Sequence, residues 1–198
     1  METISKPSLL RDTALLYKEL SEMNYSMILE NGQVIELRFP TKSYHHLVGL
    51  HKYTDIAEVT VNKQMGRSQV SIFNNILRGK ITEYDLQTSA HYTDETADRL
   101  RSFLNVKALL SNQATIIPDF DINKVPFNTK IESDLLLFRT VVETTVGTIY
   151  MHLFFIYDEH YNFYAPVTFF ENYSDAYIKN QRTLAIQEVK VEKKHKSK

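Results

Sequence analysis

The sequence contains no cysteine among its 198 residues, and only five glycines and five prolines. The absence of cysteine excludes disulfide bonds and thiolate metal sites, and it agrees with a reducing compartment. No apolar run approaches the roughly 20 residues that a membrane-spanning helix requires, so we expect no membrane contact. The first residues, METISKPSLLRD, lack the basic and apolar segments of a secretion signal. We therefore expect a protein of the cytoplasm.

The chain also has almost no excess of one sign of charge over the other. The formal net charge is -1 and the pI is about 6.7, so the chain has no global positive field of the kind that attracts nucleic acid. Any nucleic-acid site must therefore be local. With 43% hydrophobic residues, a chain of this length can bury a substantial core, and we expect one domain over residues 1–198.

Several catalytic and ligand-binding motifs are missing. The sequence has no GxxxxGK[ST] or GxGxxG loop, which excludes nucleotide-binding folds of those types. It has neither GxSxG nor a catalytic cysteine for acyl transfer. HExxH is absent, and the i, i+5 spacing of His46 and His51 splays the two rings on a helix. We expect no metal ion and no other cofactor.

Helical and hairpin patterns fill the first part of the chain. Leucines at helical spacing behind Ser8, a good N-cap, predict an N-terminal helix within residues 1–25. Asn31-Gly32 separates two short apolar runs and predicts a hairpin at the start of the segment 26–111. The same segment carries three further predicted helices, over residues 44–56, 68–77 and 94–110.

Strand patterns dominate the second part of the chain. Residues 112–130, with two prolines and several turn-forming side chains, predict an irregular connection. Residues 131–192 are rich in β-branched and aromatic residues and predict an antiparallel sheet, built from a three-stranded meander and a last alternating strand. Residues 193–198 predict a solvated basic tail. The expected fold class is α+β, with N-terminal helices and a small hairpin packed on a C-terminal antiparallel sheet of about four strands.

The segment SYHHLVGLHK, residues 43–52, concentrates three histidines. On a helix, His51 shares a face with Tyr44 and Leu47 and borders the apolar side. A partly desolvated histidine there suits acid–base catalysis, and Lys52 suits stabilisation of a phosphate. Spacing alone favours the alternative, in which His51 is a boundary residue bonded to backbone and the other histidines are solvated.

A second polar group is predicted in the sheet. His152 lies in the middle of an apolar strand, Tyr164 and Thr168 lie on the next strand, and Arg139 lies on the one before. Aromatic and cationic side chains across adjacent strands suit the binding of RNA bases and phosphates. The alternative is a sheet face on which histidine and tyrosine simply pack.

Four segments together resemble one enzyme family: LRFPTKSYHHLVGLHKYTDI, NNILRGKIT, RLRSFL and YAPVTFFEN, the last followed by a basic closing strand. The chain is similar in these segments to the phage-associated branch of the barnase, EndoU, colicin and RelE-like ribonucleases. The resemblance extends over residues 35–191, and HHLVGLHK is its most distinctive part. It implies N-terminal helices on a four-stranded antiparallel sheet, and a protein of phages or other mobile elements of bacteria.

The resemblance also implies an activity, which is metal-independent cleavage of RNA without a cofactor. A base removes the proton of a ribose 2′-hydroxyl, which attacks the adjacent phosphate, and an acid protonates the leaving 5′-oxygen. The implied partners are RNA, with tRNA as one candidate, and an antitoxin, immunity or host protein. The resemblance implies that His51 or His46 acts as one acid or base and that His152 is its partner. It implies that Lys52 and Arg139 stabilise the phosphate. Thr168 and Tyr164 are the implied hydrogen-bond donors.

Two functions from different classes remain open. A ribonuclease predicts that His51, Lys52 and a sheet histidine converge in one cleft. A non-catalytic protein that binds a host or rival protein predicts histidines that face apart and an exposed aromatic patch. The candidates for that patch are Tyr161, Phe163 and Tyr173. The near-neutral charge favours the second function, whereas local lysine clusters favour the first.

Overall fold

The Asn31-Gly32 pair forms the predicted hairpin turn. In this computed structural model, which describes residues 8–144 and 147–194, Gly32 has a φ of 83° and its N–H donates to the carbonyl of Leu29 at 2.9 Å. A positive φ of this size favours glycine. The two strands of the hairpin are β1 (Met23–Leu29) and β2 (Val34–Arg38), which pair in antiparallel register.

The predicted antiparallel meander is also present. Its strands are β4 (Leu135–Thr144), β5 (Gly147–Asp158) and β6 (Phe163–Asn172). The last alternating segment forms β7 (Leu184–Lys193), and a short strand β3 (Thr115–Ile117) precedes the meander. Of the predicted basic tail, residues 195–198 lie outside the described residues.

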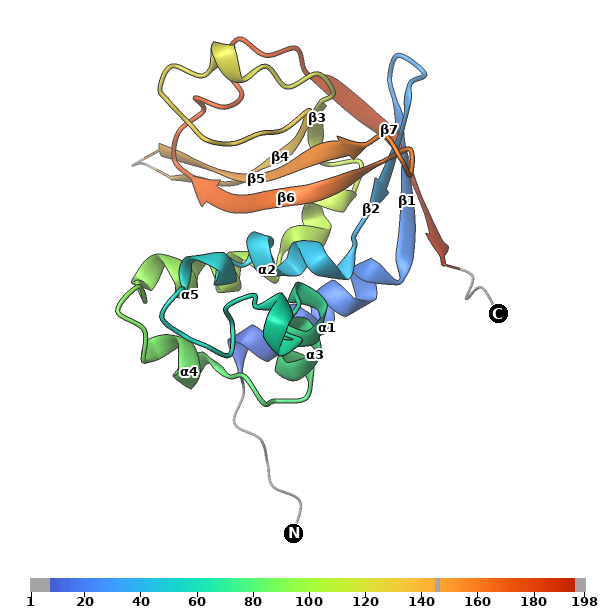
Figure 1. Cartoon of the computed structure of the whole chain (residues 1–198). Coiled ribbons are helices and arrows are strands. Elements are labelled where there is room, and N and C mark those ends of the chain that lie inside the picture. Colours follow the sequence, from blue (N-terminus) through green and yellow to red (C-terminus); the bar gives the residue numbers. More distant parts are fainter. Residues whose placement is uncertain (1–7, 145–146, 195–198) are drawn as a thin grey trace.

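The predicted four-stranded sheet is wrong, because the hairpin and the meander belong to one structure. In the described ranges seven strands form a closed, mixed barrel in the order β1-β2-β6-β5-β4-β3-β7 (Figure 1). β2 joins β6 in parallel through the single pair Leu37 and Tyr164. β7 pairs with β1 on one edge and β3 on the other, which closes the barrel. Local periodicity predicts that a segment is a strand but does not reveal its distant partner.

The helices lie together on one side of the barrel in Figure 1. Those of the described residues are α1 (Leu9–Ser21), α2 (Tyr44–Leu47), α3 (Gln69–Leu77), α4 (Glu83–Gln87) and α5 (Asp94–Phe103). The hydroxyl of Ser8 accepts from the N–H of Arg11, so the predicted cap of α1 is confirmed. Helix α4 was not predicted from the sequence; it begins with a capping box between Thr82 and Asp85. None of the helices in the described ranges is long and apolar enough to cross a membrane.

Two of the predicted helices are wrong in length. The helix predicted over residues 44–56 ends after one turn, because Gly49 adopts a left-handed φ of 79°, and a 3-10 turn, η2 (Leu50–Lys52), follows. The helix predicted over residues 94–110 divides into α5 and a second 3-10 turn, η4 (Val106–Leu110).

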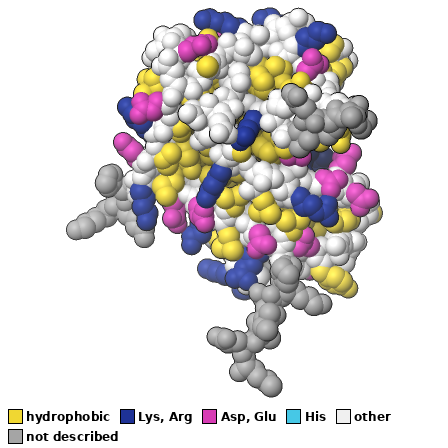
Figure 2. Space-filling view, turned by 180° about the vertical axis from the view of Figure 1, so that it is seen from behind, with side chains coloured by type: hydrophobic (Ala, Val, Ile, Leu, Met, Phe, Trp, Pro, Cys, Tyr) yellow, Lys and Arg dark blue, Asp and Glu magenta, His cyan; other side chains and the backbone are white. Residues whose placement is uncertain are grey.

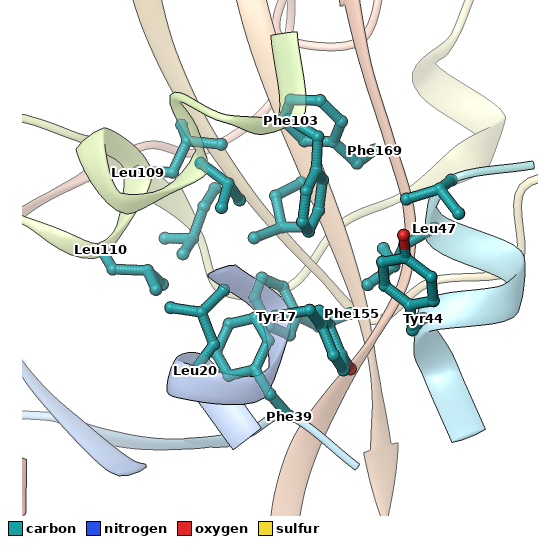
Figure 3. Packing of buried hydrophobic residues seen from close by; sticks show 14 of the residues in the cluster. Tyr17, Leu20, Phe39, Tyr44, Leu47, Phe103, Leu109, Leu110, Phe155 and Phe169 are labelled. Carbon is teal, nitrogen blue, oxygen red and sulfur yellow. The ribbon is translucent and has the colours of Figure 1, made fainter. Parts of the chain in front are cut away.

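Alternating residues of the meander face two separate cores. Leu135, Leu137 and Leu153 belong to the larger core, which also receives the helices. Figure 3 shows aromatic rings of α1, α5 and β6 within it. Leu136 and Phe154 face the opposite side, where a smaller core is covered by the segments around Phe120 and Tyr177. The sheet is therefore buried on both faces in this region.

Candidate active site

An unpaired strand edge creates the candidate site. β6 pairs with β5 along its length but with β2 at only one position, so the rest of its second edge faces α2 and α5. These elements lie beside β6 in Figure 1. A cavity of about 490 Å³ opens between them, and we call it the basic cavity. Its lining residues are His46, His51, Lys52, Arg99, Lys130, Ile131, Glu132, Val167, Thr168 and Phe170.

Two histidine rings stack at the mouth of the basic cavity. The ring centroids of His46 and His51 are 4.7 Å apart, with an angle of 30° between the ring planes. The predicted splaying of these rings is wrong, because it assumed a continuous helix. At Gly49 the chain turns, its N–H donating to the carbonyl of His46 at 3.0 Å, while its carbonyl accepts from Lys52 N–H at 3.1 Å. The turn brings two side chains five residues apart into contact.

The third histidine of the segment has a structural role. His45 is buried, and its Nε2 lies 2.9 Å from the carbonyl oxygen of Val59. Burial lowers the pKa of His45, opposed by that hydrogen bond. It therefore ties α2 to the following loop rather than facing the basic cavity.

Positive charge concentrates around the basic cavity. Five of its lining residues are basic and one, Glu132, is acidic. In the described part of the chain, the ion pairs lie elsewhere, and none includes Lys52, Arg99 or Lys130. On the face opposite to the view of Figure 1, acidic and basic side chains are instead mixed between apolar patches (Figure 2). The basic cavity is thus a local positive site on a nearly neutral protein.

Arg99 is half-buried and lies directly over the turn at Gly49. An added Cβ at Gly49 would lie 3.4 Å from its guanidinium nitrogen Nη1. Desolvation lowers the pKa of Arg99, opposed by the charge of Glu95, but an arginine remains protonated at neutral pH. A desolvated guanidinium without an ion pair attracts anions strongly.

His51 is the member of the histidine pair with an altered pKa. Desolvation, followed by the positive charges of His46, His45, Lys52 and Arg99, lowers the pKa of His51 to about 4. The residue is exposed by its accessible surface, so solvent screens part of the effect of these charges. At neutral pH the ring is uncharged and can accept a proton.

The predicted sheet residues separate into those that line the basic cavity and those that do not. Thr168 on β6 lines it. Tyr164 lies four residues before Thr168 on the same strand, which places the two residues about 13 Å apart along the strand. Arg139 lies on β4 opposite Met151, two strands from the cavity edge.

His152 lies in the smaller core. Its side chain is fully buried among Phe154, Phe170 and Tyr177, and neither ring nitrogen has a hydrogen-bond partner of normal geometry. Burial lowers the pKa of His152 to about 4, opposed only partly by the backbone of Tyr150 and Phe170. It contacts the basic cavity only indirectly, through Phe170, which lines the cavity wall.

Comparison with known proteins decides the family. A family model described as phage-Barnase-EndoU-ColicinE5/D-RelE like nuclease4 matches residues 9–198. The chain is a member of this nuclease family. The family resemblance predicted from the sequence is confirmed. No curated protein and no solved structure matches the chain.

Membership of this nuclease family implies a nucleic acid as substrate, which fits a cavity lined with unpaired cations. Sequence reasoning missed two of those cations, Arg99 and Lys130, because they lie far from the histidines along the chain. Arg99 does belong to RLRSFL, one of the four segments that resemble the nuclease family. Among the described residues, no three histidine or carboxylate side chains come close enough together to hold a metal ion.

Proposed function

We propose that this nuclease is an endoribonuclease of a bacterial phage or mobile element, and that the basic cavity is its active site. The observation that carries the proposal is the combination of a stacked histidine pair with three cations around one cavity, Lys52, Arg99 and Lys130, which form no ion pair with any residue that the structure describes. Nuclease chemistry requires both a proton acceptor and positive charge at the phosphate.

His51 acts as the base in this proposal. Its lowered pKa keeps the imidazole neutral, so it can take the proton of a ribose 2′-hydroxyl. The 2′-oxygen then forms a bond to phosphorus, the bond from phosphorus to the 5′-oxygen breaks, and His46 donates a proton to that oxygen. The products are a 2′,3′-cyclic phosphate and a free 5′-hydroxyl, and no metal ion enters the reaction.

The cations stabilise the phosphate. Arg99 lies behind the histidine pair at Gly49 and suits a two-point contact with phosphate oxygens. Lys52 and Lys130 approach the same cavity from two other segments, and the hydroxyl of Thr168 supplies a neutral donor from β6. His152, Arg139 and Tyr164 have no role in this proposal because they lie outside the cavity.

A second candidate function is supported by a separate surface. At the turn between β5 and β6, Tyr161 is 64% exposed and stacks on Phe163 with 5.8 Å between ring centroids. Exposed aromatic residues are typical of protein interfaces. A protein partner, such as an antitoxin or immunity protein, would bind there, and this function is compatible with catalysis in the basic cavity.

The test is cleavage of total RNA and of a tRNA pool by the purified protein in EDTA. We expect wild-type protein to cleave. His51→Ala should lose at least about a hundredfold in rate, the usual contribution of an acid–base group, and Arg99→Ala a similar factor through lost stabilisation of the phosphate. Lys63→Ala, which removes an exposed lysine outside the cavity, is the matched control. Equal activity in all four proteins, or no cleavage by folded wild-type protein, would overturn the assignment and favour the binding function.

A further inference from the structure

A second cavity adjoins the basic cavity. Its volume is about 590 Å³, and its lining includes Glu95, Asp98, Arg99, Phe170, Glu171 and Tyr173. Arg99 and Phe170 also line the basic cavity, so the two spaces share a wall. We call the second space the acidic cavity. Arg99 therefore borders both spaces.

The acidic cavity offers hydrogen-bond acceptors. Asp98 forms an ion pair with Arg101 at 2.5 Å. The carboxylates of Glu95 and Glu171, in contrast, make no ion pair within 4 Å and no side-chain hydrogen bond within the described part of the chain, although the charge of Glu95 acts on Arg99. Free carboxylates repel a phosphate and accept hydrogen bonds from neutral N–H donors. The acidic cavity, which Arg99 and Arg101 also line, thus offers carboxylate acceptors that the basic cavity has only at Glu132.

Aromatic side chains complete the acidic cavity. Tyr173 is 66% exposed and lines it. Phe170 forms the shared wall and is held in place from behind, because its ring stacks on His152 at 5.3 Å and on Phe154 at 5.6 Å. Flat aromatic surfaces of this kind stack on nucleobases that have left a base stack.

A nucleotide matches this pair of cavities, since it joins an anionic phosphate to a neutral aromatic ring that bears hydrogen-bond donors. We propose that the acidic cavity binds a nucleobase next to the scissile phosphate and prefers bases with an exocyclic amino group over uracil. The carboxylates of Glu95 and Glu171 accept from the amino group, whereas they repel the carbonyl oxygen that uracil carries at the same ring position. This inference rests on the proposed function only in assigning the phosphate to the basic cavity.

Binding of two nucleosides tests the proposal without any cleavage. Cytidine bears an amino group at C4 and an unprotonated N3, whereas uridine bears a carbonyl group at C4 and an N–H at N3. Ring size and stacking are matched between them. We expect chemical-shift changes at the amides of Glu171, Asn172 and Tyr173, and binding of cytidine about tenfold tighter than that of uridine. The double variant Glu95→Gln, Glu171→Gln should lose this difference. Glu159→Gln, at the exposed turn between β5 and β6, should keep it.

Two outcomes would overturn the base site: equal affinity for both nucleosides, or shifts confined to other parts of the protein. Binding of a lysine-rich peptide in place of either nucleoside would also overturn it and assign the cavity to a protein ligand. Cleavage is measured on the same preparations to separate the two proposals. Cleavage without selective nucleoside binding removes only the base site, whereas selective binding without cleavage removes only the nuclease mechanism.

Discussion

His51 and His152 have similarly lowered pKa values for different physical reasons. His51 is exposed, and its pKa falls through partial desolvation together with the positive charges around the basic cavity. His152 is fully buried, and its pKa falls because the smaller core cannot solvate a charged ring. The surroundings of His51 suit catalysis, because a phosphate that enters the cavity can neutralise the positive charges there. The lowered pKa of His152 is a stability effect.

The titration of His51 follows from its charged surroundings. NMR of the imidazole should give a midpoint of about 4 in the wild-type protein. Lys52→Ala removes one positive neighbour, so the midpoint should rise, and Lys63→Ala should leave it unchanged. Inorganic phosphate should also raise it, because a bound anion favours the protonated ring. A midpoint near 6.5 that responds to neither change would contradict the proposed electrostatics.

The stability of the smaller core should depend on pH through His152. An unfolded histidine has a pKa of about 6.5, and the folded value is about 4. Between these two pH values the unfolded state therefore binds more protons than the folded state. The free energy of unfolding should fall by about 3 kcal/mol in total as the pH decreases from about 6.5 to about 4. Above pH 6.5 this contribution is constant.

Substitution of His152 by phenylalanine should remove that pH dependence. It also deletes two buried ring nitrogens that make no hydrogen bond of normal geometry, so we expect the free energy of unfolding at pH 7 to rise by about 1 kcal/mol. Urea denaturation at several pH values measures both effects. His160→Phe, at an exposed position, serves as the control. A loss of stability at pH 7 would show that the core has no room for the larger ring.

At the scale of the secondary-structure elements, one glycine decides the geometry of the basic cavity. The segment 44–52 has helical periodicity, and the sequence predicts a continuous helix through it. Gly49 ends α2, and only after that break do His46 and His51 stack and Arg99 approach the backbone. Periodicity detects the apolar face on both sides of Gly49, but it does not detect a φ of 79°.

Gly49→Ala should impair activity beyond its effect on stability. A left-handed residue with a Cβ costs about 1–2 kcal/mol, and here the Cβ would also touch the Arg99 guanidinium, at 3.4 Å from Nη1. Gly66→Ala is a matched control, since Gly66 has a φ of 67° but no atom within 4 Å of an added Cβ. We expect similar losses of stability in urea denaturation and a reduced rate of RNA cleavage for Gly49→Ala alone. Equal rates would mean that Arg99 adjusts without consequence.

At the scale of the whole molecule, the net charge is -1, but basic side chains outnumber acidic ones around the basic cavity. A site of this size holds one or two phosphates rather than a long stretch of backbone. Binding of single-stranded RNA to the His51→Ala variant should therefore depend weakly on salt, with a slope of about -1 in a plot of log affinity against log salt concentration. A slope steeper than about -3 would indicate a basic groove that extends beyond the basic cavity.

The sequence was most informative where interactions are local. The Ser8 cap, the Asn31-Gly32 turn and the meander each depend on neighbouring residues, and all three were predicted. The barrel depends on pairings between distant segments, such as Leu37 with Tyr164, which no local pattern reports. The site follows the same division between local and distant interactions. Four predicted site residues line one cavity. Arg99 and Lys130, which reach that cavity from distant segments, were not predicted, and His152 lies in a core.

Closure of the barrel by β7 has a consequence during protein synthesis. β7 is translated after every other strand of the described chain, yet it pairs with β1, the first strand to leave the ribosome. Until residue 193 has emerged, β1 and β3 each keep an open edge that can join other strands. The barrel of the nascent chain therefore stays incomplete until β7 has been synthesised. Pairing of β7 then covers the two open edges, which until that point are accessible to chaperones and prone to aggregation.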